Sequence, residues 1–207
     1  MTRLKRTIAA GACLAAIALM GTCSSGGSSS KASDAPSTST HIVEEIDVSF
    51  ELPSDWDDLD QDMLIDASAN GPLMDELTDR MGLTTEQLQQ MASSNLVLFA
   101  AAPHAEDGLL SNLNVMVFDE ALPKAGALEL QYRGIGATDM TSEDVSTDVG
   151  DGSRLTYTLE IKDVTMYAEV IALEVDGKAV VITMSGHDAG EIADLADDVA
   201  DSLAPAA

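Results

Sequence analysis

The segment Ser153–Ser185, SRLTYTLEIKDVTMYAEVIALEVDGKAVVITMS, decides the fold because its pattern predicts three consecutive antiparallel strands. In its first part apolar residues alternate with polar ones, which is typical of a strand with one buried face: Leu155, Tyr157, Leu159 and Ile161. The apolar runs 166–175 and 179–184 predict two more strands, the last one covered on both faces. Between them, Asp176-Gly177 indicates a type I′ hairpin turn, since both turn positions need a positive φ.

The segments before this core predict further strands. Ile46, Val48, Phe50 and Leu52 alternate with polar residues up to Pro53, and the apolar runs Leu96 to Ala101 and Leu113 to Phe118 predict two more strands. The polar stretch from Thr141 to Gly152 is a connection or one more edge strand.

Helices are expected in three places. The stretch from Asn70 to Ser93 predicts two short helices, the second with a capping box at Thr84-x-x-Gln87. Pro123 is expected in the first turn of a third helix that ends at Gly134. A final helix is predicted after the cap Asp188-x-x-Glu191, with an apolar stripe facing the core and four aspartates facing water: Ile192, Leu195, Ala196, Val199 and Leu203 in the stripe, and Asp194, Asp197, Asp198 and Asp201 opposite. We expect Pro205 to end it.

This order of elements predicts an α+β fold in which helices cover a largely antiparallel β-sheet. We expect one such domain over residues 42–204, which suits a chain of 207 residues. Only 3% of the residues are aromatic, so the core must be built from aliphatic side chains and methionine.

The first 22 residues have the pattern of a secretory signal peptide. Arg3, Lys5 and Arg6 precede a short apolar stretch, and Leu19-Met20-Gly21-Thr22-Cys23 resembles a bacterial lipobox. We therefore expect cleavage before Cys23, lipidation of Cys23, and a flexible Ser/Gly-rich tether over residues 23–41. The membrane is then a partner through the anchor, and the domain lies on the extracytoplasmic face. A soluble secreted product or an uncleaved anchor is the alternative.

The charge of the chain limits its partners. The net charge is −26, so the surface repels polyphosphates and nucleic acid is excluded as a partner. The same charge disfavours a domain lying flat on anionic lipid.

No motif in the sequence predicts catalysis, a cofactor or a metal site. Asp58-x-Asp60-x-Asp62 starts like a calcium loop, but Met63 and Ala69 stand where glycine and the bidentate acid belong, so a solvated loop is expected. Ser185-Gly186-His187-Asp188 lacks the Gly-x-Ser-x-Gly elbow, and helix capping by Ser185 or Asp188 is the simpler role. The three histidines are scattered along the chain: His41, His104 and His187.

Four residues are candidates for contact with an apolar ligand. Trp56 is the only tryptophan, and it either stacks on a ligand or covers the edge of the sheet. Met116, Met166 and Met184 would line an adaptable pocket between sheet and helices, although such methionines are more often part of a core.

Over about residues 42–204 the chain resembles the actinobacterial LpqN/LpqT-type lipoproteins. The features behind this resemblance are the leader and tether, Phe50-x-Leu52-Pro53-x-x-Trp56 after the first strand, a central helix, the late three-strand meander and a closing acidic helix. Members of that family more often have glycine where this chain has Asp55. The resemblance implies a PsbP-like α/β/α sandwich and a non-catalytic accessory or binding role in the cell envelope. A carrier or sensor of a lipid-like ligand is the alternative, and an enzyme with an unrecognised site is a third.

Overall fold

The computed structural model describes residues 37–60, 62–63, 84, 95–106, 109–161 and 164–206. The signal peptide, Cys23 and most of the tether lie outside the described residues, and so do the two helices expected between 70 and 93, apart from Thr84. In the part that the structure describes, no helix is long and apolar enough to cross a membrane.

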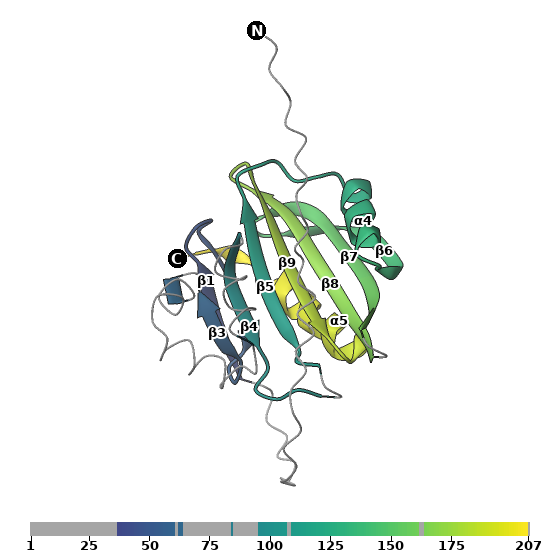
Figure 1. Cartoon of the computed structure of the whole chain (residues 1–207). Helices are drawn as coiled ribbons and strands as arrows, with labels where there is room; N and C mark the ends of the chain where they lie inside the picture. The colour runs from purple at the N-terminus through teal and green to yellow at the C-terminus, as the bar shows by residue number, and fades with distance from the viewer. Residues whose placement is uncertain are drawn as a thin grey trace.

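The described strands form two antiparallel sheets (Figure 1). The larger has the strand order β3-β4-β5-β9-β8-β7-β6, with these bounds: β3 (Asp57–Asp60), β4 (Leu96–Ala101), β5 (Asn112–Phe118), β6 (Thr138–Thr147), β7 (Gly150–Ile161), β8 (Val164–Val175) and β9 (Lys178–Gly186). The smaller has the order β1-β2-β10, with these bounds: β1 (Thr38–Val43), β2 (Val48–Pro53) and β10 (Ala204–Pro205). The predicted α+β class with a largely antiparallel sheet is confirmed.

The expected meander forms the middle of the large sheet. Strands β7, β8 and β9 pair in sequence, with Tyr157 opposite Ala168 and Ala168 opposite Ser185. Asp176 and Gly177 have φ angles of 52° and 79°, as a type I′ turn requires. Of the polar segment before the meander, residues 141–147 belong to edge strand β6, as the edge-strand interpretation expects, whereas residues 150–152 already begin β7.

Helix α5 (Ala189–Ser202) begins where the sequence predicts. The side chain of Asp188 accepts hydrogen bonds from the backbone N–H groups of Gly190 (2.8 Å) and Glu191 (3.0 Å). The expected apolar stripe is buried, and the four aspartates on the opposite side are exposed. Helix α4 (Ala125–Gly134) begins two residues after Pro123, with Lys124 as its N-cap, so the expected position of Pro123 in the first turn is wrong.

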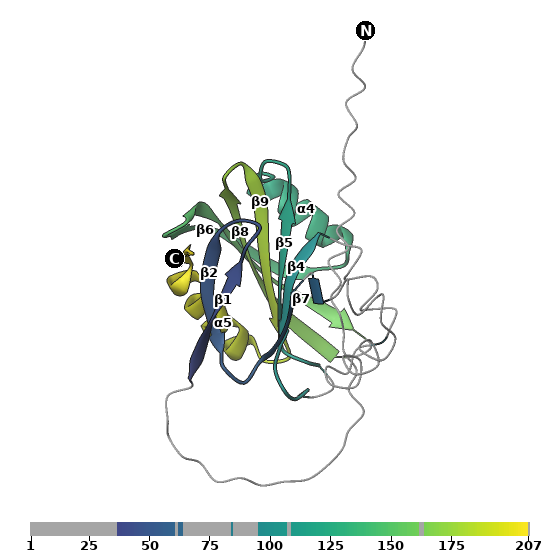
Figure 2. The ribbon, with the colours of Figure 1, turned by 90° about the vertical axis from the view of Figure 1, so that its left-hand side faces the viewer.

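The helices lie on opposite sides of the large sheet (Figure 2). On one side, α5 and the β1-β2 layer pack on β4, β5, β8 and β9 around a core that includes Phe50, Leu113, Ile182 and Val199. On the other side, α4 packs on β7, β8 and β9 through Leu128 and Tyr132. In β8 and β9, alternate residues enter the two cores, as the period-2 pattern requires.

Two expectations about the N-terminal part of the fold are wrong. Asp57–Asp60 is not a loop but edge strand β3, in which Leu59 is fully buried opposite Phe99 of β4. One apolar residue among aspartates gives no periodicity from which to predict a strand. Residues 38–41, expected in the tether, belong to β1, whose polar side chains alternate in exposure as it pairs with β2. Helix α5 ends at Ser202, before Pro205 as expected, and Pro205 itself pairs with Val48 as part of the short strand β10.

Candidate functional site

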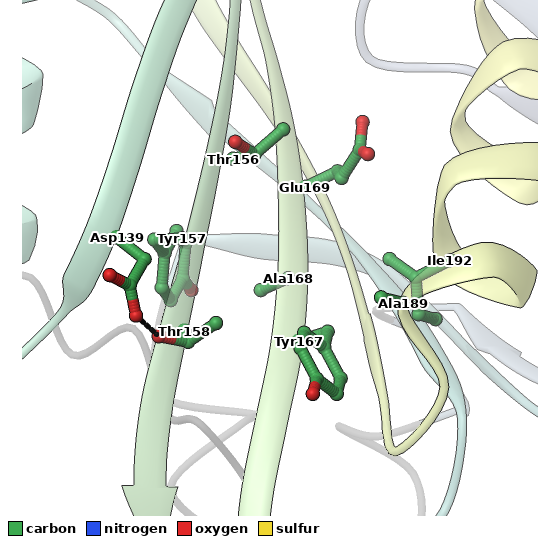
Figure 3. A pocket seen from close by; sticks show the side chains of 9 residues that line it. All are labelled: Asp139, Thr156, Tyr157, Thr158, Tyr167, Ala168, Glu169, Ala189 and Ile192. Carbon is green, nitrogen blue, oxygen red and sulfur yellow. Dashed lines mark hydrogen bonds between the residues drawn. The ribbon is translucent and has the colours of Figure 1, made fainter.

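A pocket of about 250 Å³ lies between the N-terminal turn of α5 and strands β6, β7 and β8 (Figure 3). Helix α5 contributes Ala189 and Ile192 to one wall. The strands contribute the other lining residues: Asp139, Thr156, Tyr157, Thr158, Tyr167, Ala168 and Glu169. None of the nine lining residues is basic, so the pocket offers oxygen atoms and apolar surface to a ligand.

The alternation of β7 and β8 explains why polar side chains gather here. Leu155, Tyr157 and Leu159 enter the core under α4, which directs Thr156 and Thr158 to the α5 side of the sheet. On β8 the same alternation directs Tyr167 and Glu169 to the α5 side, while Ala168 belongs to the α4 core. The pocket therefore occupies the end of this face that α5 leaves open.

Asp139 enters the pocket from a distorted part of edge strand β6. The register between β6 and β7 shifts between Thr138 and Thr141, and Asp139 there has a φ of 49°. Its Oδ2 accepts a hydrogen bond from the Thr158 hydroxyl at 3.1 Å. Of the three described non-glycine residues with positive φ, Asp47 and Asp176 lie in turns and only Asp139 lies within a strand. A bulge of this kind redirects a side chain, and here it places a carboxylate beside the threonines.

Glu169 reaches the pocket from the centre of an ion-pair cluster. The Arg154 guanidinium donates from Nε to Glu169 Oε2, and from Nη1 to Asp197 on α5. Its Nη2 donates to the Ala193 carbonyl at 3.3 Å. Burial by itself would lower the pKa of Arg154, but the hydrogen bonds and charges of Glu169 and Asp197 outweigh it and raise the pKa. The cluster fixes α5 to the sheet and holds the carboxylate of Glu169 at the pocket.

Threonine pairs form the side of the site toward β6. The hydroxyls of Thr138 and Thr158 lie 2.8 Å apart, and those of Thr141 and Thr156 lie 2.5 Å apart. Such cross-strand pairs stabilise a sheet edge. Because each hydroxyl both donates and accepts, they also provide hydrogen bonds to a hydroxylated ligand.

A second group of side chains lies at the start of α5. Glu106, His187 and Glu191 each place one potential ligand atom within 4.8 Å of the others. His187 Nε2 lies 3.4 Å from Glu106 Oε2, and His187 Nδ1 is buried without a hydrogen-bond partner. Imidazole and carboxylate groups are suitable ligands for a divalent cation. Three ligand atoms would hold such an ion only with water completing its coordination. This group was not predicted from the sequence, because Glu106 is distant in the chain from His187 and Glu191.

The structure gives Ser185, His187 and Asp188 separate environments. Ser185 is buried in β9, Asp188 caps α5, and His187 faces Glu106. Among the described residues no hydrogen bond joins the Ser185 hydroxyl to either of the other two. Of the two capping candidates, Asp188 is the cap.

The four candidate ligand residues do not converge on this pocket. Trp56 and Met184 belong to the core under α5, where Trp56 is half-buried. Met166 belongs to the core under α4. Met116 is the register partner of Val181, a member of that same α4 core, so it lies on the α4 side. The sheet therefore separates Trp56 and Met184 from Met116 and Met166.

The α4 core also contains a buried tyrosine pair. The rings of Tyr132 and Tyr157 lie 4.8 Å apart between centroids. Burial raises the pKa of both phenols. At Tyr132 the nearby Thr183 hydroxyl partly opposes this rise. At Tyr157 the electrostatic interaction with Tyr132 adds to it. Both phenols therefore stay neutral in the folded protein.

The acidic and threonine residues of the pocket were not predicted from the sequence as site residues. In the sequence, Thr156 and Thr158 are simply the polar residues of an alternating strand. Asp139 is one of 36 acidic residues, so nothing marks it as part of a site. Their position beside α5 depends on the bulge in β6 and on where α5 ends, and neither follows from local sequence. The alternation in β7 was the one available signal.

Comparison with known proteins identifies the fold. No family model matches the chain, and no curated protein matches it. Among solved structures, the chain is similar to the solution structure of cyanobacterial PsbP (CyanoP) from Synechocystis sp. PCC 6803, with a TM-score of 0.51 and 15% identity. The match covers 85% of this chain and 96% of CyanoP. The predicted PsbP-like fold is thus confirmed, and this chain is a PsbP-like α+β protein in its architecture.

Proposed function

We propose that the protein is a non-catalytic binding module anchored through a lipid on Cys23 to the extracytoplasmic face of the cell membrane. In this role it serves as an accessory to an envelope protein or another envelope component. The observation that carries the proposal is the pocket beside α5, which offers carboxylates, hydroxyls and an apolar wall. None of its lining residues is a cysteine, serine, histidine or lysine, so it lacks the serine or cysteine nucleophile and histidine base that many acyl hydrolases use.

Two further observations support this proposal. The leader pattern up to Cys23 and the polar segment after it fit a tethered lipoprotein. The PsbP-like fold agrees with the sequence resemblance to LpqN/LpqT-type lipoproteins. We propose membership of that family on the combination of leader, tether and fold.

The anchor is tested by fractionating cells that express the full chain or its Cys23→Ala variant. The wild type is expected in the membrane fraction and Cys23→Ala outside it, because loss of the acylated thiol removes the attachment. Cys13→Ala is the matched control and should stay with the membrane. Equal sedimentation of wild type and Cys23→Ala with membranes would contradict the anchor.

A carrier of a lipid-like ligand is the alternative function. One observation favours it: Met116 and Met166 lie on the same side of the large sheet, next to α4. A native mass spectrum of the purified full chain tests this alternative. A co-purified apolar adduct that Met166→Ser removes would favour the carrier, and an adduct-free spectrum of the folded chain would count against it.

A further inference from the structure

We propose that the pocket beside α5 binds an ammonium group carried by a hydroxylated or otherwise polar ligand. This inference rests on the proposed binding function and names the chemistry of its ligand. The site is defined by Asp139, Thr156, Thr158, Tyr167 and Glu169 from the sheet, with Ala189 and Ile192 from α5.

The charges at the site select a cation. Asp139 and Glu169 both line the pocket, and no lining residue is basic. Among the described residues, Arg154 is the basic residue that forms an ion pair with a lining residue, and its guanidinium already donates to Glu169, Asp197 and the Ala193 carbonyl. Three carboxylates, those of Asp139, Glu169 and Asp197, outnumber this one arginine at the site, so the local charge is negative on a chain whose net charge is −26. An anion would be repelled from this site and a cation attracted.

Unused hydrogen-bond capacity at the site matches an ammonium group. Asp139 accepts from threonine on Oδ2 and Glu169 accepts from Arg154 on Oε2, which leaves the other oxygen of each carboxylate for a ligand. An ammonium group is a donor only, so it pairs with such acceptors in charge-assisted hydrogen bonds. The hydroxyls of Thr156, Thr158 and Tyr167 can serve polar groups on the rest of the ligand.

The backbone of Asp139 supports a binding role for this residue. Its left-handed conformation lies within a strand, and non-glycine residues seldom adopt that conformation. Strained residues of this kind concentrate at ligand sites. The conformation places the Asp139 carboxylate across the pocket from Ala189 and Ile192 (Figure 3).

The size of the pocket limits the ligand. About 250 Å³ is enough for a single sugar ring or the end of a lysine side chain, but not for a long lipid. The ammonium group can therefore come from a free amino sugar or from a lysine of a partner protein. The chemistry that the site recognises is the same in both cases.

The test is calorimetric titration of the purified full chain in uncharged detergent, below the pKa of the probe amine. Three matched pyranoses serve as probes: glucosamine (cation), glucose (neutral) and glucuronate (anion). We expect glucosamine to bind about tenfold or more tightly than glucose, because a hydrogen bond to a charged group contributes about 1.5–3 kcal/mol. Glucuronate should bind most weakly. Equal binding of glucose and glucosamine, tighter binding of glucuronate, or no binding of any ammonium probe would overturn the proposal.

Two variants locate the binding. Asp139→Asn keeps a side chain that tolerates the left-handed conformation and should weaken glucosamine binding about tenfold or more. Asp144→Asn removes the same charge from an exposed position on the same strand and should leave binding unchanged. Equal weakening by the two variants would show attraction to the general acidic surface and overturn the site.

A further arm distinguishes the source of the ammonium group. Nα-acetyl-lysinamide binding more tightly than glucosamine would indicate a lysine of a partner protein, and the reverse would indicate a free amino sugar. Either result supports the ammonium site. If no ammonium probe binds but Cys23→Ala still leaves the membrane fraction, the ligand assignment fails while the anchored module stands.

Discussion

The α5 side of the large sheet has two halves that differ in chemistry. In the covered half, β5, β8 and β9 present apolar residues such as Leu113, Leu173 and Ile182 to α5 and the small sheet. In the open half, β6, β7 and β8 present Asp139, Thr156, Thr158, Tyr167 and Glu169 to the pocket. The same strand β8 supplies both kinds of residue. Burial by α5 therefore determines which part of the face stabilises the fold and which part is available to a ligand.

Arg154 and its partners mark the boundary between the two halves. The guanidinium joins the buried Glu169 on β8 to the exposed Asp197 on α5. An ion pair placed there meets water on one side and the core on the other.

The largest effect is expected from the covered half. Ile182→Ala should lower the free energy of unfolding by about 2–5 kcal/mol, because this fully buried side chain would leave a cavity. Ile42→Ala is the matched control: Ile42 is 54% exposed, and its loss should change stability by less than about 0.5 kcal/mol. Urea denaturation of both variants measures this, and similar losses would show that the covered half is not the stabilising core.

At the boundary, Arg154→Met should destabilise the protein by about 3 kcal/mol, because it leaves Glu169 buried without its partner. Adding Glu169→Leu should recover most of that loss, since two apolar side chains then replace the buried pair. The double variant measures whether the pair contributes net stability. No recovery would mean that the arginine acts through packing of its methylene groups and not through charge.

At the start of α5 we expect a stability effect that depends on pH. The N–H groups of Glu191 and Gly190 hold the pKa of Asp188 below its usual value of 3.8. Its contribution to stability is therefore present above pH 3.8 and is lost as the pH falls through the lower folded value. Asp188→Asn keeps a cap without the charge, so wild type should exceed it in stability at neutral pH and match it in strong acid. A difference that does not change with pH would contradict this.

The smallest effect is expected in the open half. Asp139→Gly relieves the left-handed backbone but loses the hydrogen bond with Thr158, so the free energy of unfolding should change by less than about 1 kcal/mol. Thermal denaturation measures it. A loss as large as that of Ile182→Ala would mean that this residue maintains the fold, and that its strain needs no ligand to explain it.

The covered half could be predicted from sequence and the open half could not. Period-2 alternation, the Asp176-Gly177 turn and the Asp188 cap all act over a few residues, so they predict the meander and α5. The open half depends on contacts between distant segments: Arg154 with Asp197, and Asp139 with Thr158 across a bulge. Strands β1 and β3 were missed for a related reason. Their side chains are mainly polar, and backbone pairing with β2 and β4 forms them.

The most direct test of the division between the halves is an amide NMR titration of the full chain with glucosamine. We expect shifts at the residues of the open half: Asp139, Thr156, Thr158, Tyr167, Glu169 and Ala189. The amides of Leu113, Leu173 and Ile182 should not move. Shifts that spread evenly over the acidic surface, or that centre on the covered half, would contradict the account.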